Sequence, residues 1–70
     1  NYTIVRPGPL NDEPGTGLID VATELKRRGS VPREDVAAVL LHVLDAPHTH
    51  GKQFELLSGD TPLQQALAAL

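Results

Sequence analysis

The chain opens with a strand-forming run that ends abruptly in prolines and a glycine. Tyr2 to Val5 are all β-branched or aromatic, and Arg6-Pro7-Gly8-Pro9 follows at once. An apolar strand without polar alternation is typical of the inside of a parallel sheet that helices cover. Most of such a sheet is not in these 70 residues. We therefore expect the chain to be the last part of a larger α/β domain.

Length and composition limit what the chain does alone. A domain of this size buries only about 60% of its unfolded surface, and there is no cysteine to cross-link it. The net charge of −3 argues against a nucleic-acid groove, and the basic run Lys26-Arg27-Arg28 is read as solvated surface. No apolar stretch reaches the ~20 residues of a membrane span. We expect a cytoplasmic protein that needs partner surface, with no nucleic-acid or membrane partner.

Residues 7 to 17 hold three glycines and three prolines, so neither a helix nor a strand ladder persists there. A loop of this composition holds a defined shape and brings bare backbone close to a ligand. It follows the carboxyl end of a strand, where open α/β sheets bind their ligands. Gly15-Thr16-Gly17 lacks the third glycine of a dinucleotide-binding loop and is interpreted as a turn.

The next segment is ambiguous and is followed by a clear helix. Residues 18 to 22 suit a short strand and residues 23 to 28 suit a helix, so their structure stays open. Two carboxylates after Pro32 mark a helix start. Val36 to Leu44 is apolar except His42, and a narrow polar stripe is expected at Asp35, Ala38, His42 and Asp45. Such a helix packs on a sheet with neighbours beside it, so it requires cover.

A second strand and a second helix complete the pattern. Gln53 to Leu57 reads as the strand, and Thr61-Pro62 reads as an N-cap followed by proline at the first helical position. The expected apolar face of the second helix is Leu63, Ala66, Leu67 and Leu70. The order strand, loop, helix, strand, helix predicts an α/β fold, with a right-handed crossover between the two strands.

Five short motifs, in order along nearly the whole chain, resemble one family, the atypical short-chain dehydrogenase/reductases, or NAD-dependent epimerase/dehydratase-like proteins. The motifs are Tyr2-Thr3-Ile4-Val5-Arg6-Pro7-Gly8, Glu13-Pro14-Gly15-Thr16-Gly17, Arg33-Glu34-Asp35-Val36-Ala37, Gly51-Lys52-Gln53-Phe54-Glu55-Leu56 and Gly59-Asp60-Thr61-Pro62. The resemblance implies the carboxyl-terminal third of one NAD(P)-binding, Rossmann-like, doubly wound parallel sheet over residues 1–70. The part with the phosphate-binding glycine loop would lie outside this chain.

The resemblance also implies a cofactor and a position for it. NADP or NAD would be bound mainly by residues outside this chain, with the nicotinamide beside Pro7, Gly8, Pro9 and Leu10. A turn at a strand's carboxyl end suits a flat ring, since it offers backbone groups and a small apolar wall. The alternative is that these four residues only turn the chain.

The sequence departs from the family pattern in ways that leave the chemistry open. Pro32 stands where a helix-capping serine is common, and residues 18 to 29, which would cover the substrate, are atypical. Tyr2 and Arg6 repeat the spacing of the family's Tyr/Lys pair, but on a strand they would lie some 13 Å apart. No catalytic residue is therefore assigned, and the substrate stays unknown.

Other polar side chains are weaker candidates, the histidines for metal binding and Asp12 and Glu13 for acid–base catalysis. His42, His48 and His50 invite a metal site, yet solvated loop histidines explain the last two better, so we assign no metal. Asp12 and Glu13 precede Pro-Gly and suit a surface turn.

Three functional hypotheses follow. The first is part of an NAD(P)-dependent oxidoreductase or epimerase-like enzyme, inactive as this fragment alone. The second is a non-catalytic module of the same fold that senses NAD(P) or binds a protein. The third is a piece stabilised by pairing with another copy or with an amino-terminal part. Substrate, cofactor preference and oligomeric state are not encoded in an obvious motif.

Overall fold

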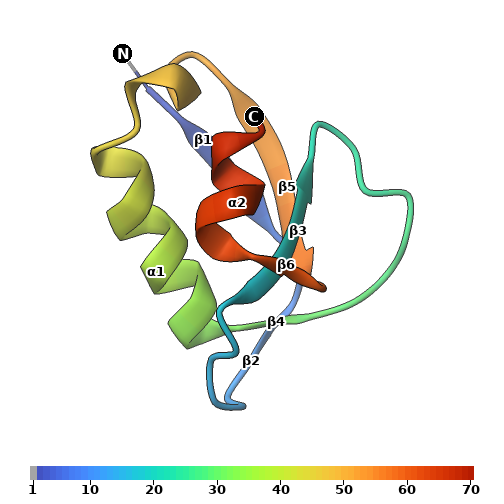
Figure 1. The fold of residues 1–70 in the computed structure, drawn as a ribbon. Coiled ribbons are helices and arrows are strands. Elements are labelled where there is room, and N and C mark those ends of the chain that lie inside the picture. Colours follow the sequence, from blue (N-terminus) through green and yellow to red (C-terminus); the bar gives the residue numbers. More distant parts are fainter. Residues whose placement is uncertain (1) are drawn as a thin grey trace.

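The computed structural model describes residues 2–70, in which the strands form one main sheet and one small sheet and the helices pack beside them (Figure 1). The main sheet has the strand order β1-β5-β3-β6, and the small sheet pairs β2 with β4. The strands are β1 (Ile4–Pro7), β2 (Leu10–Asn11), β3 (Leu18–Ala22), β4 (Val31–Pro32), β5 (Gln53–Ser58) and β6 (Thr61–Pro62). The helices are α1 (Arg33–Leu44), the 3-10 helix η1 (Pro47–Thr49) and α2 (Leu63–Ala68).

The two strands predicted from the sequence are parallel neighbours. β1 pairs with β5 from Ile4 opposite Gln53 to Pro7 opposite Leu56, and α1 lies between them in the chain. This arrangement confirms the predicted α/β fold with its crossover helix. The first strand begins at Ile4 instead of Tyr2, which is 62% exposed, and the expectation that it is buried is wrong within residues 2–70, where β1 is a mostly exposed edge strand.

The undecided segment after the loop is an antiparallel strand. β3 pairs with β5 on one side and with β6 on the other, so the sheet is mixed. Thr61 was expected to cap the second helix but instead belongs to β6, opposite Ile19. The helix begins one residue later, after Pro62, and its first N–H, that of Leu63, donates to the Gly17 carbonyl at 2.9 Å. A backbone acceptor therefore takes the place of the predicted side-chain cap.

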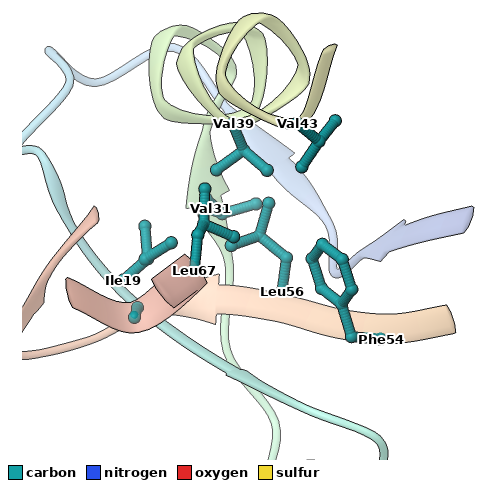
Figure 2. Close-up of a cluster of buried hydrophobic side chains, with 8 residues drawn as sticks. Ile19, Val31, Val39, Val43, Phe54, Leu56 and Leu67 are labelled. Atoms are coloured by element: carbon teal, nitrogen blue, oxygen red, sulfur yellow. The ribbon is translucent and has the colours of Figure 1, made fainter. Parts of the chain in front are cut away.

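The hydrophobic core lies between the main sheet and both helices (Figure 2). Figure 2 shows Val39 and Val43 of α1 above Phe54 and Leu56 of β5, with Leu67 of α2 beside them. Period-two alternation sends Phe54 and Leu56 to the same face of β5, and both side chains are almost fully buried. The predicted apolar face of α2 is confirmed: Ala66 and Leu67 are buried, and Leu63 and Leu70 pack against the core.

The first turn of α1 binds the loop that precedes β3. Asp35 is only 3% exposed, and its carboxylate accepts hydrogen bonds from Thr16 N at 3.1 Å, Thr16 Oγ1 at 3.3 Å and Gly17 N at 3.0 Å. Glu34 Oε1 accepts a fourth bond, from Gly15 N at 2.6 Å. The expected polar stripe is therefore wrong at Asp35, whose carboxylate is buried against the donors of Thr16 and Gly17 and does not face water.

The helix start predicted near Pro32 is confirmed, and no side chain caps it. Ser30, one candidate for the cap, is used elsewhere: its carbonyl accepts from Ser58 N at 3.1 Å and its Oγ accepts from Asn11 Nδ2 at 2.9 Å. The two acidic residues of the first turn lie at the positive end of the helix dipole, which they stabilise without capping. The bonds to Glu34 and Asp35 attach the loop before β3 to α1, and the bond between Ser58 and Ser30 attaches the loop after β3 to β5.

The outer face of α1 has little cover within residues 2–70. Leu40, Leu41 and Leu44 are 48%, 69% and 73% exposed, so the expected neighbours beside this helix are not among the described residues. The outer edge of β1 likewise has no strand partner in this part of the chain. In residues 2–70, no helix has the length and apolar character needed to cross a membrane.

Candidate functional site

A pocket of about 370 Å³ opens where β1 ends. Pro7, Gly8 and Pro9 form one wall, so three of the four residues predicted to contact the nicotinamide line a single cavity. Leu10, the fourth, lies in β2 opposite Val31 and is not in the lining. The position matches the place where ligands bind in open α/β sheets, beyond the carboxyl ends of parallel strands.

The pocket lies on the face of the sheet that the helices leave free. Val5 and Leu56 pack toward the helices, so alternation sends Arg6, Glu55 and Leu57 to the opposite face. These three side chains line the pocket. The pocket therefore combines the turn after β1 with polar and apolar side chains from the two parallel strands.

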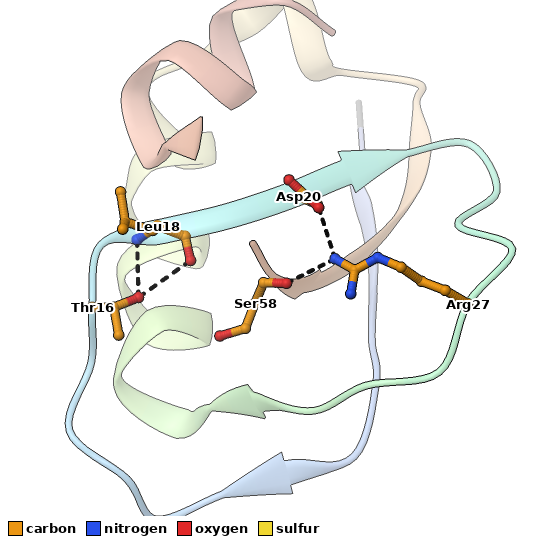
Figure 3. Close-up of polar contacts among 5 residues, drawn as sticks. All are labelled: Thr16, Leu18, Asp20, Arg27 and Ser58. Atoms are coloured by element: carbon orange, nitrogen blue, oxygen red, sulfur yellow. Dashed lines mark hydrogen bonds and ion pairs between the residues drawn. The ribbon is translucent and has the colours of Figure 1, made fainter. Parts of the chain in front are cut away.

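The second wall is the loop between β3 and β4, which contributes Leu25, Arg27, Arg28 and Gly29. Figure 3 shows Arg27 reaching both neighbouring strands. Its Nη2 donates to Asp20 Oδ2 at 2.7 Å and to the Ser58 carbonyl at 2.8 Å. These two contacts fix the loop over the sheet although it has no helix or strand of its own.

Further hydrogen bonds fix the two walls relative to each other. The Leu25 N–H donates to Glu55 Oε1 at 2.6 Å, which attaches the loop to β5. The Gly8 N–H donates to the Leu56 carbonyl at 3.0 Å, and the Val31 N–H donates to the Pro9 carbonyl at 3.0 Å. The walls are thus joined at their base by the small sheet of β2 and β4.

Gly8 packs closely against the opposite wall. A Cβ built on it would meet Leu57 Cδ2 at 2.5 Å and the Gly29 carbonyl oxygen at 3.1 Å. A side chain at this position would push against Leu57, which is 5% exposed, and against the backbone of the opposite wall. The bare backbone of Gly8 therefore allows the turn to pack closely against Leu57 and Gly29.

The weaker candidates take structural positions. Asp12 Oδ1 pairs with Arg33 Nε at 2.9 Å on the surface. His48 is not simply solvated, because its Nε2 lies 2.8 Å from the Leu67 carbonyl at the end of α2. Among residues 2–70, no cluster of three or more metal-ligating side chains is present.

A second hollow, of about 470 Å³, lies over the apolar side of α1. Tyr2, Leu40, Leu41 and Leu44 contribute to it, and all four are exposed. It has no acid or arginine in its lining and lies at the amino end of β1, away from the Pro7 turn. Because its lining is mostly apolar, this hollow is better suited to packing against another protein surface than to binding a polar ligand.

Little in the sequence indicates the second wall. Arg27 was read as solvated surface, whereas its guanidinium is fixed by an ion pair with Asp20 and a strand carbonyl. The partners lie seven and thirty-one residues away, so periodicity cannot reveal them. The one available sign was the cluster Lys26-Arg27-Arg28 between two apolar segments.

Comparisons with known proteins agree on one family. A family model described as NAD(P)H-binding matches residues 1–47. The chain is 46% identical over 69 residues to an uncharacterized sugar epimerase, YhfK, of Bacillus subtilis, and 35% identical over 75 residues to the UPF0659 protein YMR090W of Saccharomyces cerevisiae. These alignments cover 99% and 100% of this chain but 32% and 33% of the relatives.

Two solved structures share the fold. One, a candidate NAD-dependent epimerase/dehydratase from Bacillus halodurans, superposes with a TM-score of 0.95 at 46% identity. The other, the oxidoreductase ylbE from Lactococcus lactis, superposes with a TM-score of 0.88 at 35% identity. Each match covers 99% of this chain and 33% or 31% of the other. The predicted Rossmann-like fold is confirmed, and the chain spans about a third of the length of the curated relatives it matches.

Proposed function

The chain belongs to the NAD(P)H-binding family, and we propose that residues 1–70 form the carboxyl-terminal part of one NAD(P)-binding Rossmann domain. The remaining part, including a glycine-rich loop for the pyrophosphate, would precede it. The limited share of each relative that the chain covers supports this division. The complete protein would be a cytoplasmic oxidoreductase or epimerase-like enzyme, and this segment alone would be inactive.

Within that protein, the turn Pro7 to Leu10 would lie beside the nicotinamide ring. The observation that carries this assignment is the pocket after β1, whose wall is Pro7, Gly8 and Pro9. The prolines offer flat apolar surface to the ring, and the absence of a side chain at Gly8 lets the turn pack closely against Leu57 and Gly29 of the same pocket. Leu10 would lie farther from the ring than the other three residues, since it is in β2, outside the pocket lining, and is 41% exposed.

The residues of the pocket fit such a cofactor by shape and chemistry. Gly8 packs its bare backbone against Leu57, and both residues line the pocket beside Pro7 and Pro9. When bound, a nicotinamide cofactor supplies hydride transfer, while the protein supplies binding and orientation. The part assigned to this segment is to orient the ring, through the Pro/Gly turn, and to hold the opposite wall, through Arg27 and Glu55.

Calorimetric titration of the full-length protein with NADPH and with NADH tests this proposal. We expect saturable binding of at least one of them, and oxidation or reduction of the bound cofactor during turnover. A bound cofactor that is never consumed would favour the alternative, a non-catalytic NAD(P) sensor. Binding of neither cofactor would contradict both.

The exposed leucines of α1 would be covered by the preceding part of the same domain. In the isolated 70-residue chain, where that cover is missing, we expect self-association through this face. Replacing Leu41 and Leu44 together with glutamine should lower the sedimentation coefficient toward that of a monomer, because these are the two most exposed leucines of the face. Circular dichroism of the same samples reports whether the fold is retained.

Leu18→Gln serves as the matched control for this experiment. Leu18 is 39% exposed but lies on β3, so its replacement should leave self-association unchanged. A folded, monomeric wild-type chain would contradict the need for cover.

A further inference from the structure

Two arginines line the pocket without an acidic partner. Arg6, Arg27 and Arg28 are all in the lining, together with one acidic residue, Glu55. Arg27 forms an ion pair with Asp20. Among the described residues, Arg6 and Arg28 have no carboxylate within 4.0 Å. Two arginines without a carboxylate partner thus line one cavity of a chain whose net charge is −3.

Glu55 does not cancel this charge in the way its position would suggest. It lies opposite Arg6 in the register of the parallel strands, and neighbouring residues in register share a face of the sheet. Its Oε1 nevertheless accepts the Leu25 N–H at 2.6 Å, and it forms no ion pair with Arg6 in the part of the chain that the structure describes. Glu55 therefore holds the loop while the guanidinium of Arg6 stays available.

The rest of the cavity has the make-up of a small-molecule site. Its volume of about 370 Å³ lies within the range of ~300–1,000 Å³ typical of ligand pockets. Pro7, Pro9, Leu25 and Leu57 supply apolar surface around the two arginines. Guanidinium groups bind carboxylates and phosphates through paired charge-assisted hydrogen bonds.

We propose that Arg6 and Arg28 bind an anionic group of the substrate, a carboxylate or a phosphate, in the pocket between the Pro7 turn and the loop after β3. This inference rests on the proposed function, since a molecule that shares the pocket with the nicotinamide is the substrate. The arginines bind and position the substrate and have no part in bond making. Neutral substrates of the same size would bind more weakly.

Titration of the full-length protein with inorganic phosphate and with acetate, followed by NMR, tests the inference without knowledge of the substrate. Chloride at matched ionic strength is the reference. We expect phosphate, acetate or both to cause saturable shifts of the Arg6 and Arg28 Nε–H signals and of the Gly8 and Gly29 amides. The stronger of the two anions indicates which group the substrate carries. Shifts no larger than those caused by chloride would overturn the inference.

Variants separate a specific site from general surface charge. Arg6→Gln combined with Arg28→Gln should weaken the anion's binding at least tenfold, and the corresponding double lysine variant should retain part of it because it keeps both charges. Arg33→Gln removes one charge from an exposed arginine on α1, outside the pocket, and should leave binding within twofold of wild type. An equal loss in the Arg33 variant would reduce the effect to net charge and contradict the site.

Cofactor titration of the same variants distinguishes this inference from the proposed function. The double glutamine variant should bind NADPH and NADH as wild type does. A loss of NADPH affinity parallel to the loss of phosphate affinity would assign the arginines to the cofactor's own phosphates and overturn a substrate role. If wild type bound neither cofactor, the proposed function would fail, whereas the anion titration would still report on the site itself.

Discussion

Replacing Asp35 with alanine is expected to lower the free energy of unfolding of the full-length protein by about 3 kcal/mol, since hydrogen bonds to a charged group contribute ~1.5–3 kcal/mol and unpaired buried donors add a penalty. The carboxylate is 3% exposed and accepts from Thr16 N, Thr16 Oγ1 and Gly17 N. Its loss leaves the backbone N–H groups of Thr16 and Gly17 without this acceptor, whereas Thr16 Oγ1 still donates to the Leu18 carbonyl at 3.2 Å. Urea unfolding, followed by far-UV circular dichroism, measures the change.

Asp45→Ala is the matched control for this variant. Asp45 is exposed at the carboxyl end of the same helix, where a negative charge is unfavourable to the helix dipole. We expect its removal to change stability by less than about 0.5 kcal/mol, as for most surface substitutions. Equal destabilisation by both changes would show that the bonds from Thr16 and Gly17 contribute nothing particular.

Replacing Gly8 with alanine should damage both stability and cofactor binding. The new Cβ would lie 2.5 Å from Leu57 Cδ2 and 3.1 Å from the Gly29 carbonyl oxygen, and overpacking of this kind costs about 1–3 kcal/mol. Relief of the contact moves the Pro7–Pro9 turn away from the opposite wall. We expect NADPH or NADH affinity to fall about tenfold, which corresponds to ~1.4 kcal/mol.

Gly29→Ala provides the control for packing across the same gap. Its Cβ would meet Arg27 Nη1 at 3.6 Å and the Leu57 methyl groups at 3.7 and 3.8 Å, which are ordinary contacts. The stability of this variant should stay within about 0.5 kcal/mol of wild type. If Gly8→Ala changed neither the free energy of unfolding nor the cofactor affinity, the close approach of the two walls would not be required for the structure.

The parts of the fold that the sequence predicted are those with a local signal. β1, α1, β5 and α2 follow from apolar periodicity and from the prolines and glycines that end it. A turn at Pro7, Gly8 and Pro9 was expected from the same reasoning, and a ligand beside it was implied by the family resemblance; in the structure these three residues line the pocket. Leu10 is the residue of this group that the pocket does not include.

The parts that could not be predicted depend on contacts between distant residues. Asp35 reads as one member of a polar stripe, and its burial depends on loop donors about eighteen residues earlier in the chain. Thr61 is a residue type favoured at helix N-caps, but in the structure it belongs to β6 and pairs with Ile19 of β3. Residues 23 to 30 have no regular structure, and their position is set by Glu55, Asp20 and Ser58. Helical or strand propensity contains none of this information.

The loop from Thr23 to Gly29 is attached at both ends and at two points along its length, through Leu25 and Arg27. The side chains between these attachments, such as that of Arg28, are free to differ without displacing the turn at Pro7. Exchange of a few amino acids on this wall would therefore leave the backbone of the Pro7–Pro9 wall in place. The two sides of the pocket can change independently of each other.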